Sequence, residues 1–120
     1  MLRLDGIISR SGGLGRQGIS LASYERAIDK LFESKNLKAV AVVVNSPGGS
    51  PVQSALIAKR LRDLAAEKEL PLVSFCEDVA ASGGYWLACA GDQIFADPNS
   101  IVGSIGVISA GFGFPELIER

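Results

Sequence analysis

The chain has 120 residues, 48% of them hydrophobic and 7% aromatic, which describes one globular domain with a core of small aliphatic side chains. It has 12 Lys and Arg and 13 Asp and Glu, and the basic residues form no cluster. The charge pattern therefore does not predict nucleic acid or an acidic membrane surface as a partner. It contains no histidine, which excludes Ser-His and Cys-His mechanisms within this chain.

The N-terminal third predicts a strand, a loop and a helix. Apolar residues partly alternate over 2–8, as in a strand, and a Gly- and Ser-rich loop follows over 11–20. Residues 24–31 then carry apolar side chains at helical spacing. Ser20 or Ser23 is expected to cap the N-terminus of this helix.

The middle of the chain predicts a buried parallel sheet. Residues 38–44 form an apolar run without alternation, which indicates burial on both faces of a sheet flanked by helices. A helix with apolar positions over 52–65 must end before Pro71, and a second buried strand covers 72–76. Because a helix of ordinary crossover length joins the two strands, we expect them to be adjacent and parallel.

The C-terminal third predicts a short apolar helix over 85–90, a strand over 92–96, a turn, and a glycine-punctuated strand over 101–108. Residues 114–120 begin a helix that is only about one turn long. The sequence therefore predicts a single domain, 1–120, that is incomplete at its C-terminus.

Ser82 is the candidate nucleophile. It follows a predicted buried strand and precedes Gly83 and Gly84, so its hydroxyl is expected to be uncovered, above a helix N-terminus and beside the N–H of Gly83. The alternative is a serine that only caps the helix after it.

Gly48 and Gly49 are the candidate oxyanion donors. They lie in the segment 45–50, where the run 40–44 ends, and glycines at a strand end allow backbone N–H groups to point outward. A tight strand-to-helix turn explains the same two glycines, and both interpretations are compatible. We expect the Ser82 hydroxyl to converge with the N–H groups of Gly83 and of Gly48 or Gly49.

Other patterns favour structural explanations. Cys76 and Cys89 lie in apolar runs without CxxC spacing, which predicts buried free thiols and no metal site. The GxGxxG pattern over 13–18 is followed by a strand without a ribose-binding carboxylate, so no cofactor is expected. Glu77 and Asp78 are interpreted as a solvated loop rim rather than an acid–base pair.

Three segments together resemble the signal peptide peptidase A family of bacterial serine peptidases, including its SohB-like members: the loop 45–49, the junction 80–86 and the strand 103–107. The similarity runs in register over nearly the whole chain. More distantly, the chain is similar to the Clp protease catalytic subunit and the crotonases. The resemblance implies an α/β fold of the Clp/crotonase type, a spiral of strand-strand-helix units with a largely parallel sheet.

The resemblance also implies a Ser-Lys dyad. Ser82 would attack the scissile carbonyl, and Gly83 with Gly48 or Gly49 would supply oxyanion N–H donors. A substrate-binding strand is implied as well, made of Gly103, Ser104, Ile105, Gly106 and Val107. In the short members of this family the base lysine comes from a helix well downstream of the serine, which here lies beyond Arg120.

The implied function is a serine endopeptidase that acts on hydrophobic signal-peptide remnants or membrane-derived polypeptides, with a homo-oligomeric assembly. Two alternatives remain open: a non-catalytic peptide-binding or assembly relative, and a crotonase-like acyl-CoA enzyme. The sequence shows neither a signal peptide nor a transmembrane segment. We therefore expect a bacterial cytoplasmic location, or one peripheral to the inner membrane.

Overall fold

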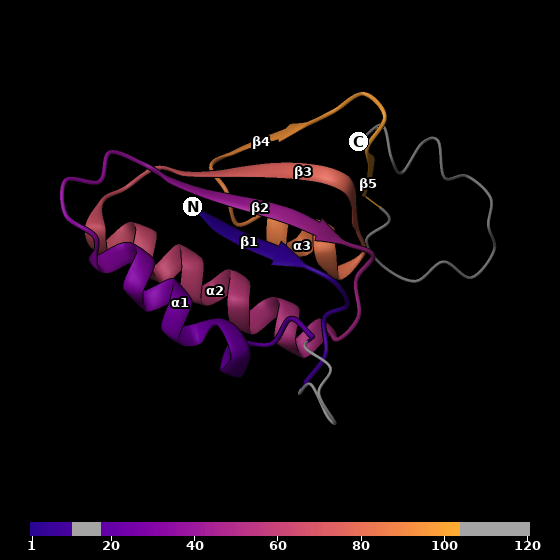
Figure 1. Cartoon of the computed structure of the whole chain (residues 1–120), viewed down its shortest axis with the longest axis horizontal. Coiled ribbons are helices and arrows are strands. Elements are labelled where there is room, and N and C mark those ends of the chain that lie inside the picture. The colour runs from indigo at the N-terminus through magenta and orange to yellow at the C-terminus, as the bar shows by residue number, and fades with distance from the viewer. Residues whose placement is uncertain (11–17, 104–120) are drawn as a thin grey trace.

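A computed structural model describes residues 1–10 and 18–103. These residues form a five-stranded, fully parallel sheet with three helices packed on one face (Figure 1). The elements in chain order are β1 (Leu2–Asp5), α1 (Leu21–Glu33), β2 (Val40–Ser46), α2 (Pro51–Lys68), β3 (Leu72–Ala81), α3 (Gly83–Ala88), β4 (Gln93–Ala96) and β5 (Ile101–Gly103).

The sheet order is β1-β2-β3-β4, with β5 paired to the end of β3. β2 and β3 are adjacent and parallel, as predicted, and their register starts with Val40 opposite Leu72. The register shifts between Val44 and Ser46, so Ser46 lies opposite Ala80. Because all the strands run the same way, the carboxyl ends of β1, β2 and β3 lie at one edge of the sheet, on the right of Figure 1.

Side-chain caps fix the start of both long helices. The Ser20 Oγ accepts the Ser23 N–H at 3.1 Å before α1, and the Ser50 Oγ accepts the Gln53 N–H at 3.2 Å before α2. Pro51 occupies the first turn of α2, where its missing N–H costs nothing. The predicted capping of the first helix and the predicted end of the second before Pro71 are confirmed.

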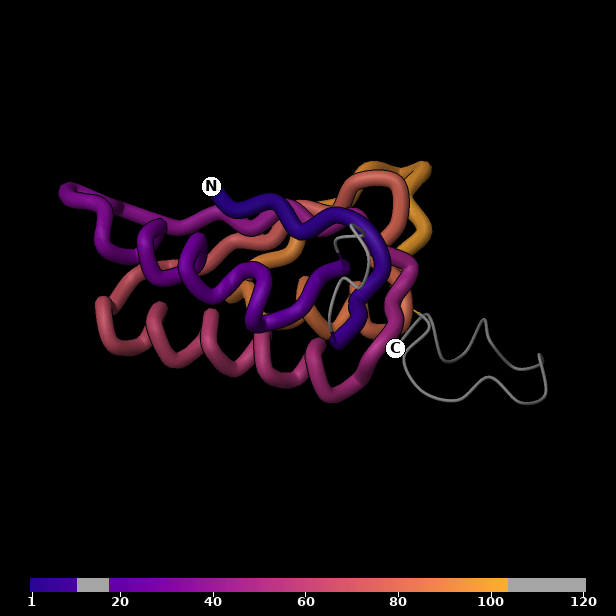
Figure 2. Tube along the Cα trace, turned by 60° about the horizontal axis from the view of Figure 1, so that its bottom comes forward, coloured from indigo at the N-terminus to yellow at the C-terminus, as the bar shows by residue number. Residues whose placement is uncertain are grey.

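The three helices lie on the same face of the sheet (Figure 2). Leu72, Ser74 and Cys76 are buried on that face, and the Ser74 Oγ donates to the Ala88 carbonyl at the end of α3. In the described residues helices cover only this face, but Val43, on the other face of β2, is also buried, with 7% of its surface exposed. On the opposite face Phe75 and Phe95 stack with ring centroids 5.5 Å apart and are 42% and 51% exposed.

β3 continues five residues beyond the predicted end at Cys76. The extension has partners on both sides: the Val79 N–H donates to the Asn45 side-chain Oδ1, Ala80 pairs with Ser46 of β2, and residues 79–81 pair with 101–103 of β5. Glu77 and Asp78 therefore lie within a strand rather than on a loop rim, and the Glu77 carboxylate pairs with Arg3. Neither partner is local in sequence, so the apolar run alone did not predict this part of the strand.

Asp92 ties the start of β4 to the start of β3. Its N–H donates to the Leu72 carbonyl at 2.6 Å, and its Oδ2 accepts the Leu72 N–H at 2.7 Å. Arg62 donates to Oδ1 at 3.1 Å. The hydrogen bond from Leu72, aided by the Arg62 charge and opposed by desolvation, lowers the pKa of the Asp92 carboxyl.

Asp92→Asn is expected to cost more stability near neutral pH than in acid. A carboxyl whose pKa falls on folding contributes stability above its unfolded pKa of about 4, and this contribution is lost as pH falls through the lower folded-state pKa. Urea midpoints of both proteins near neutrality and near about pH 3 measure the effect. Asp63→Asn, in an exposed ion pair with Lys59, is the control. A gap between wild type and Asp92→Asn that is the same at both pH values would contradict the prediction.

Within residues 1–10 and 18–103, no helix combines the length and the apolar character needed to cross a membrane.

Candidate active site

Ser82 lies where β3 turns into α3, at the carboxyl edge of the sheet. Its backbone has φ 53° and ψ −121°, a conformation that non-glycine residues rarely adopt and that costs about 1–3 kcal/mol. The residue is exposed, and its N–H donates to the Gly103 carbonyl at 2.8 Å. A strained strand-to-helix turn presents the serine hydroxyl to substrate in the α/β-hydrolases.

The simple capping role for Ser82 does not agree with this geometry. The residue occupies the N-cap position of α3, but its side chain makes no capping hydrogen bond. A cap residue normally has an extended backbone and a hydroxyl that accepts an N–H from the first turn. The Ser82 hydroxyl is therefore left available at the surface.

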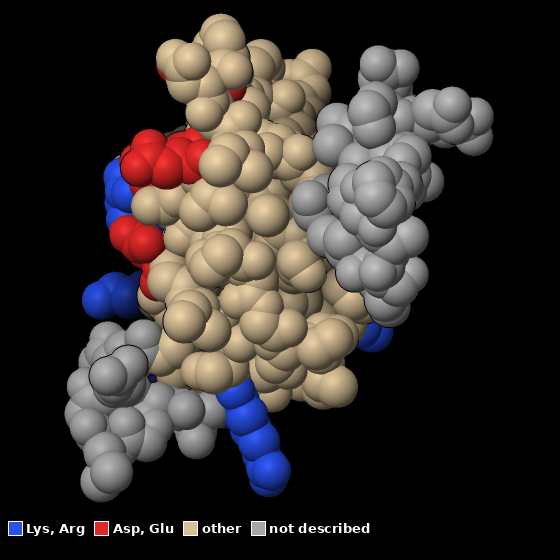
Figure 3. Space-filling model, turned by 90° about the vertical axis from the view of Figure 1, so that its right-hand side faces the viewer, with Lys and Arg blue, Asp and Glu red and all other residues tan. Residues whose placement is uncertain are grey.

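The structure brings Ser82, Gly83 and the 48–49 loop together. A methyl group added at Gly48 would lie 2.9 Å from the Ser82 Cβ and 3.1 Å from the Gly83 N, so these three backbones are in close contact. Gly48 has φ 114° and Gly49 has φ 143°, which favour glycine at both positions. Figure 3 shows that this end of the molecule is mostly uncharged outside the grey residues.

Hydrogen bonding distinguishes the two loop glycines. The Gly48 N–H donates to the buried Ser46 Oγ at 3.1 Å. Within the described part of the chain, the N–H groups of Gly49 and Gly83 have no acceptor. The peptide between Gly48 and Gly49 is trans, and its carbonyl accepts the Ile8 N–H at 2.9 Å.

The orientation of the peptide group between Gly48 and Gly49 determines where the Gly49 N–H points. In a planar trans peptide the C=O and N–H point to opposite sides. The carbonyl points to Ile8, which follows β1, and β1 and β3 lie on opposite sides of β2. The Gly49 N–H therefore points away from the β1 side, toward the side of the sheet where β3 ends at Ser82.

The glycines after Ser82 also have a packing role, which the sequence interpretation missed. A methyl group at Gly84 would overlap with the Ser46 carbonyl, and one at Gly83 would overlap with the Ser54 Oγ. α3 therefore approaches β2 and α2 closely only because both positions lack a side chain. Ser46 and Ser54 are both fully buried supporting residues. Ser46 lies inside the 45–49 motif, but neither serine was a candidate site residue from the sequence.

Of the predicted substrate strand only Gly103 lies within the described residues; Ser104, Ile105, Gly106 and Val107 lie outside them. Gly103 ends β5 with φ 113° and open space around the position of an added methyl group. Its carbonyl accepts the Ser82 N–H, so this strand end adjoins the candidate nucleophile.

No lysine of this chain lies buried at the site. The five lysines are all exposed: Lys30, Lys35, Lys38, Lys59 and Lys68. A lysine acts as a general base near neutral pH only when desolvation or nearby charge lowers its pKa. Within the described residues, the candidate nucleophile therefore has no buried lysine beside it.

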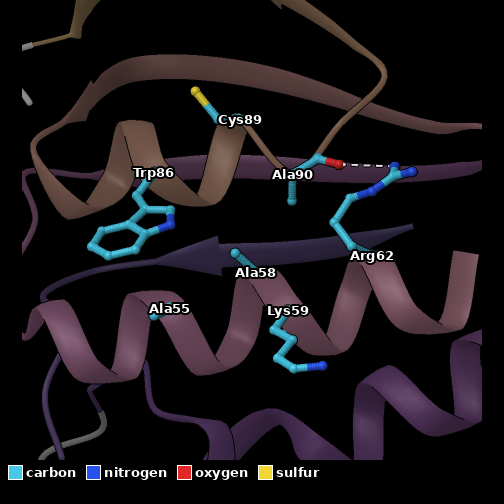
Figure 4. A pocket seen from close by; sticks show the side chains of 7 residues that line it. All are labelled: Ala55, Ala58, Lys59, Arg62, Trp86, Cys89 and Ala90. Atoms are coloured by element: carbon cyan, nitrogen blue, oxygen red, sulfur yellow. Dashed lines mark hydrogen bonds between the residues drawn. The ribbon is translucent and has the colours of Figure 1, made fainter.

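A groove of about 430 Å³ lies between α2 and α3, and its lining does not include Ser82 (Figure 4). Trp86 is 42% exposed beside it. Cys89 lines the groove and is exposed, so the prediction that both thiols are buried is wrong for Cys89 and correct for Cys76. Burial, and then the neighbouring Cys89, raise the pKa of Cys76, while a hydrogen bond with Cys89 raises the pKa of Tyr85.

Comparison with known proteins identifies the class. The model of peptidase family S49 matches residues 64–120. A putative signal peptide peptidase SppA of Enterococcus faecium is 34% identical over 122 residues, which cover 99% of this chain and 35% of that protein. The chloroplastic serine protease SPPA of Arabidopsis thaliana is 38% identical over 124 residues, which cover 100% of this chain and 18% of that protein.

Residues 64–120 thus match the S49 peptidase family, and the whole chain is similar to signal peptide peptidases, the family that its motifs resemble. A stretch of the Na(+)/H(+) antiporter NhaA of Brucella melitensis is 57% identical over 120 residues, all of this chain but 16% of that protein. A mutant of the 1510-N membrane-bound stomatin-specific protease superposes with a TM-score of 0.66 at 19% identity, over 89% of this chain and 47% of that one. This likeness confirms the α/β fold of the Clp type. The chain spans at most about a third of these sequence relatives.

Proposed function

We propose that the chain carries the nucleophile of a serine endopeptidase. The observation that carries this proposal is Ser82 itself, exposed on a strained strand-to-helix turn and packed against Gly48. The match to the S49 family model and the names of the peptidase relatives support it.

In the proposed reaction the Ser82 Oγ attacks the scissile carbonyl carbon, and its proton passes to a general base. The carbonyl oxygen becomes an oxyanion, which the Gly83 N–H and a loop glycine N–H stabilise by hydrogen bonds. We assign the loop donor to Gly49, because the Gly48 N–H is already donated to Ser46. Collapse of the tetrahedral intermediate expels the amine and leaves an acyl group on Ser82, which water then removes.

The base in this proposal is a lysine outside residues 1–120. All five lysines of the chain are exposed, and none has the buried setting that a catalytic lysine requires. A lysine from the downstream helix that the family resemblance implies, or from another chain, would complete a Ser-Lys dyad.

The proposed substrates are hydrophobic peptide segments such as signal-peptide remnants or membrane-derived polypeptides. The mostly uncharged surface at the carboxyl edge of the sheet agrees with such substrates (Figure 3). The proposal places the protein in the bacterial cytoplasm or at the inner membrane surface, as a homo-oligomer.

Binding of a peptide boronate tests the nucleophile without requiring turnover. Boron accepts the serine oxygen while the hydroxyl proton is released to water, and the tetrahedral anionic adduct resembles the intermediate. We expect a hydrophobic peptide boronate to bind residues 1–120 at least about 10²-fold more tightly than the matching peptide amide. Ser82→Ala should reduce boronate affinity to that of the amide, and Ser34→Ala, beyond the end of α1, is the control.

Equal affinity of the wild-type chain for boronate and amide would contradict the peptidase proposal. Tight but Ser82-independent binding of both peptides would favour the peptide-binding alternative.

A further inference from the structure

Ser46 ends β2 beneath the loop that holds the candidate oxyanion donor. Its side chain is fully buried, and its Oγ accepts the Gly48 N–H at 3.1 Å. Its carbonyl lies under Gly84, close enough that a methyl group there would overlap with it. One residue thus contacts both the loop and the helix that follows Ser82.

Three hydrogen bonds hold the loop in place around Gly48 and Gly49. The Gly48 N–H donates to the Ser46 Oγ, the Ile8 N–H donates to the Gly48 carbonyl, and the Ser50 N–H donates to the Ile8 carbonyl at 2.8 Å. Two of these bonds join backbone groups, so they do not require any side chain. Ser46 supplies the only side chain among the three.

We propose that Ser46 is a positioning residue for peptide-bond hydrolysis, and this proposal rests on the proposed function. By holding the Gly48 N–H, its hydroxyl sets the rotation of the loop and directs the adjacent Gly49 N–H toward the oxyanion. A donor that shifts by about an ångström loses much of its stabilisation of the transition state while ground-state contacts change little. The Ser46 hydroxyl therefore acts on the tetrahedral state rather than on peptide binding.

Ser46→Ala tests the proposal, with Ser74→Ala as the matched control. Both serines are fully buried on the helix-covered face of neighbouring strands, and each hydroxyl bonds one backbone group. Ser74 donates to the Ala88 carbonyl at 2.7 Å, at the far end of α3 from Ser82. The two variants thus lose comparable buried hydrogen bonds, and only one lies at the loop.

Two readouts are measured on residues 1–120. The first is hydrogen exchange of the Gly48 amide by NMR, which we expect to become at least about tenfold faster in Ser46→Ala and to stay unchanged in Ser74→Ala. The second is the ratio of peptide-boronate to peptide-amide affinity. We expect this ratio to fall about 10- to 100-fold in Ser46→Ala, with amide affinity unchanged, and to stay within about twofold in Ser74→Ala.

An unchanged boronate-to-amide ratio in Ser46→Ala would overturn the positioning role, and so would an equal fall in Ser74→Ala. If the wild-type chain forms no Ser82-dependent adduct, the proposed function fails, and the positioning role fails with it. Faster exchange of the Gly48 amide in Ser46→Ala would then still show that the Ser46 hydroxyl accepts the Gly48 N–H. Should Ser46→Ala not fold, Ser46→Cys keeps a similar volume with a weak sulfur acceptor, and the same direction of change is expected.

Discussion

Replacing Ser82 with alanine is expected to lower hydrolysis of a hydrophobic fluorogenic peptide by about 10⁴-fold or more, in a form of the protein whose sequence continues past Arg120 to a further lysine. Removing the nucleophile of a serine protease costs nearly as much as removing the whole catalytic unit. The measurement is kcat/KM, with Ser34→Ala as the control. Turnover that survives Ser82→Ala would contradict the assignment of the nucleophile.

The same assay on residues 1–120 alone is expected to show only a small residue of the catalysed turnover. Oxyanion donors and a helix N-terminus stabilise the tetrahedral intermediate, but they do not remove the hydroxyl proton of Ser82. The residual acceleration of such a site is on the order of 10³. Full Ser82-dependent turnover by this chain would show that the base is already present.

Gly49→Ala is expected to reduce the free energy of unfolding by about 3–5 kcal/mol. Gly49 has φ 143°, and an added methyl group would overlap with the Ile8 backbone. The unfavourable conformation costs about 1–3 kcal/mol, and forced overpacking costs a similar amount. Urea unfolding, with the slope m unchanged, measures the loss.

Gly6→Ala separates the two causes. Gly6 has φ 113°, and its added methyl group would meet no atom within 4 Å. We therefore expect only the conformational penalty, about 1–2 kcal/mol, in this variant. Equal losses in Gly6→Ala and Gly49→Ala would show that the contact with Ile8 carries no energy of its own.

Local sequence signals predicted the elements whose causes are local. The unbroken apolar run of β2, the serine before α1 and Pro71 after α2 each act within a few residues, and each prediction agrees with the structure. The parallel pairing of β2 and β3 followed from the length of the intervening helix.

The predictions that failed depend on partners far along the chain. β3 extends to Ala81 because β5 and the Asn45 side chain supply hydrogen bonds. Similarly, no pattern around the glycines after Ser82 indicates that α3 must approach the Ser46 carbonyl. The apolar run of β2 also did not indicate what lies beside each of its residues. Val43 is flanked in the sheet by Arg3 of β1 and Phe75 of β3, and no helix covers it.

The parallel pairing of the sheet has a kinetic consequence. Leu2 pairs with Val42 and Val40 with Leu72, so each of these pairings closes a loop of about thirty to forty residues before it gains contacts. Every strand pair in the described sheet is parallel, so these strands include no hairpin that could form early and guide the pairing of the other strands. The turn at Ser82 is held by Gly48 on one side and Gly103 on the other. Its strained conformation therefore becomes stable only after β2, β3 and β5 have assembled, late in folding.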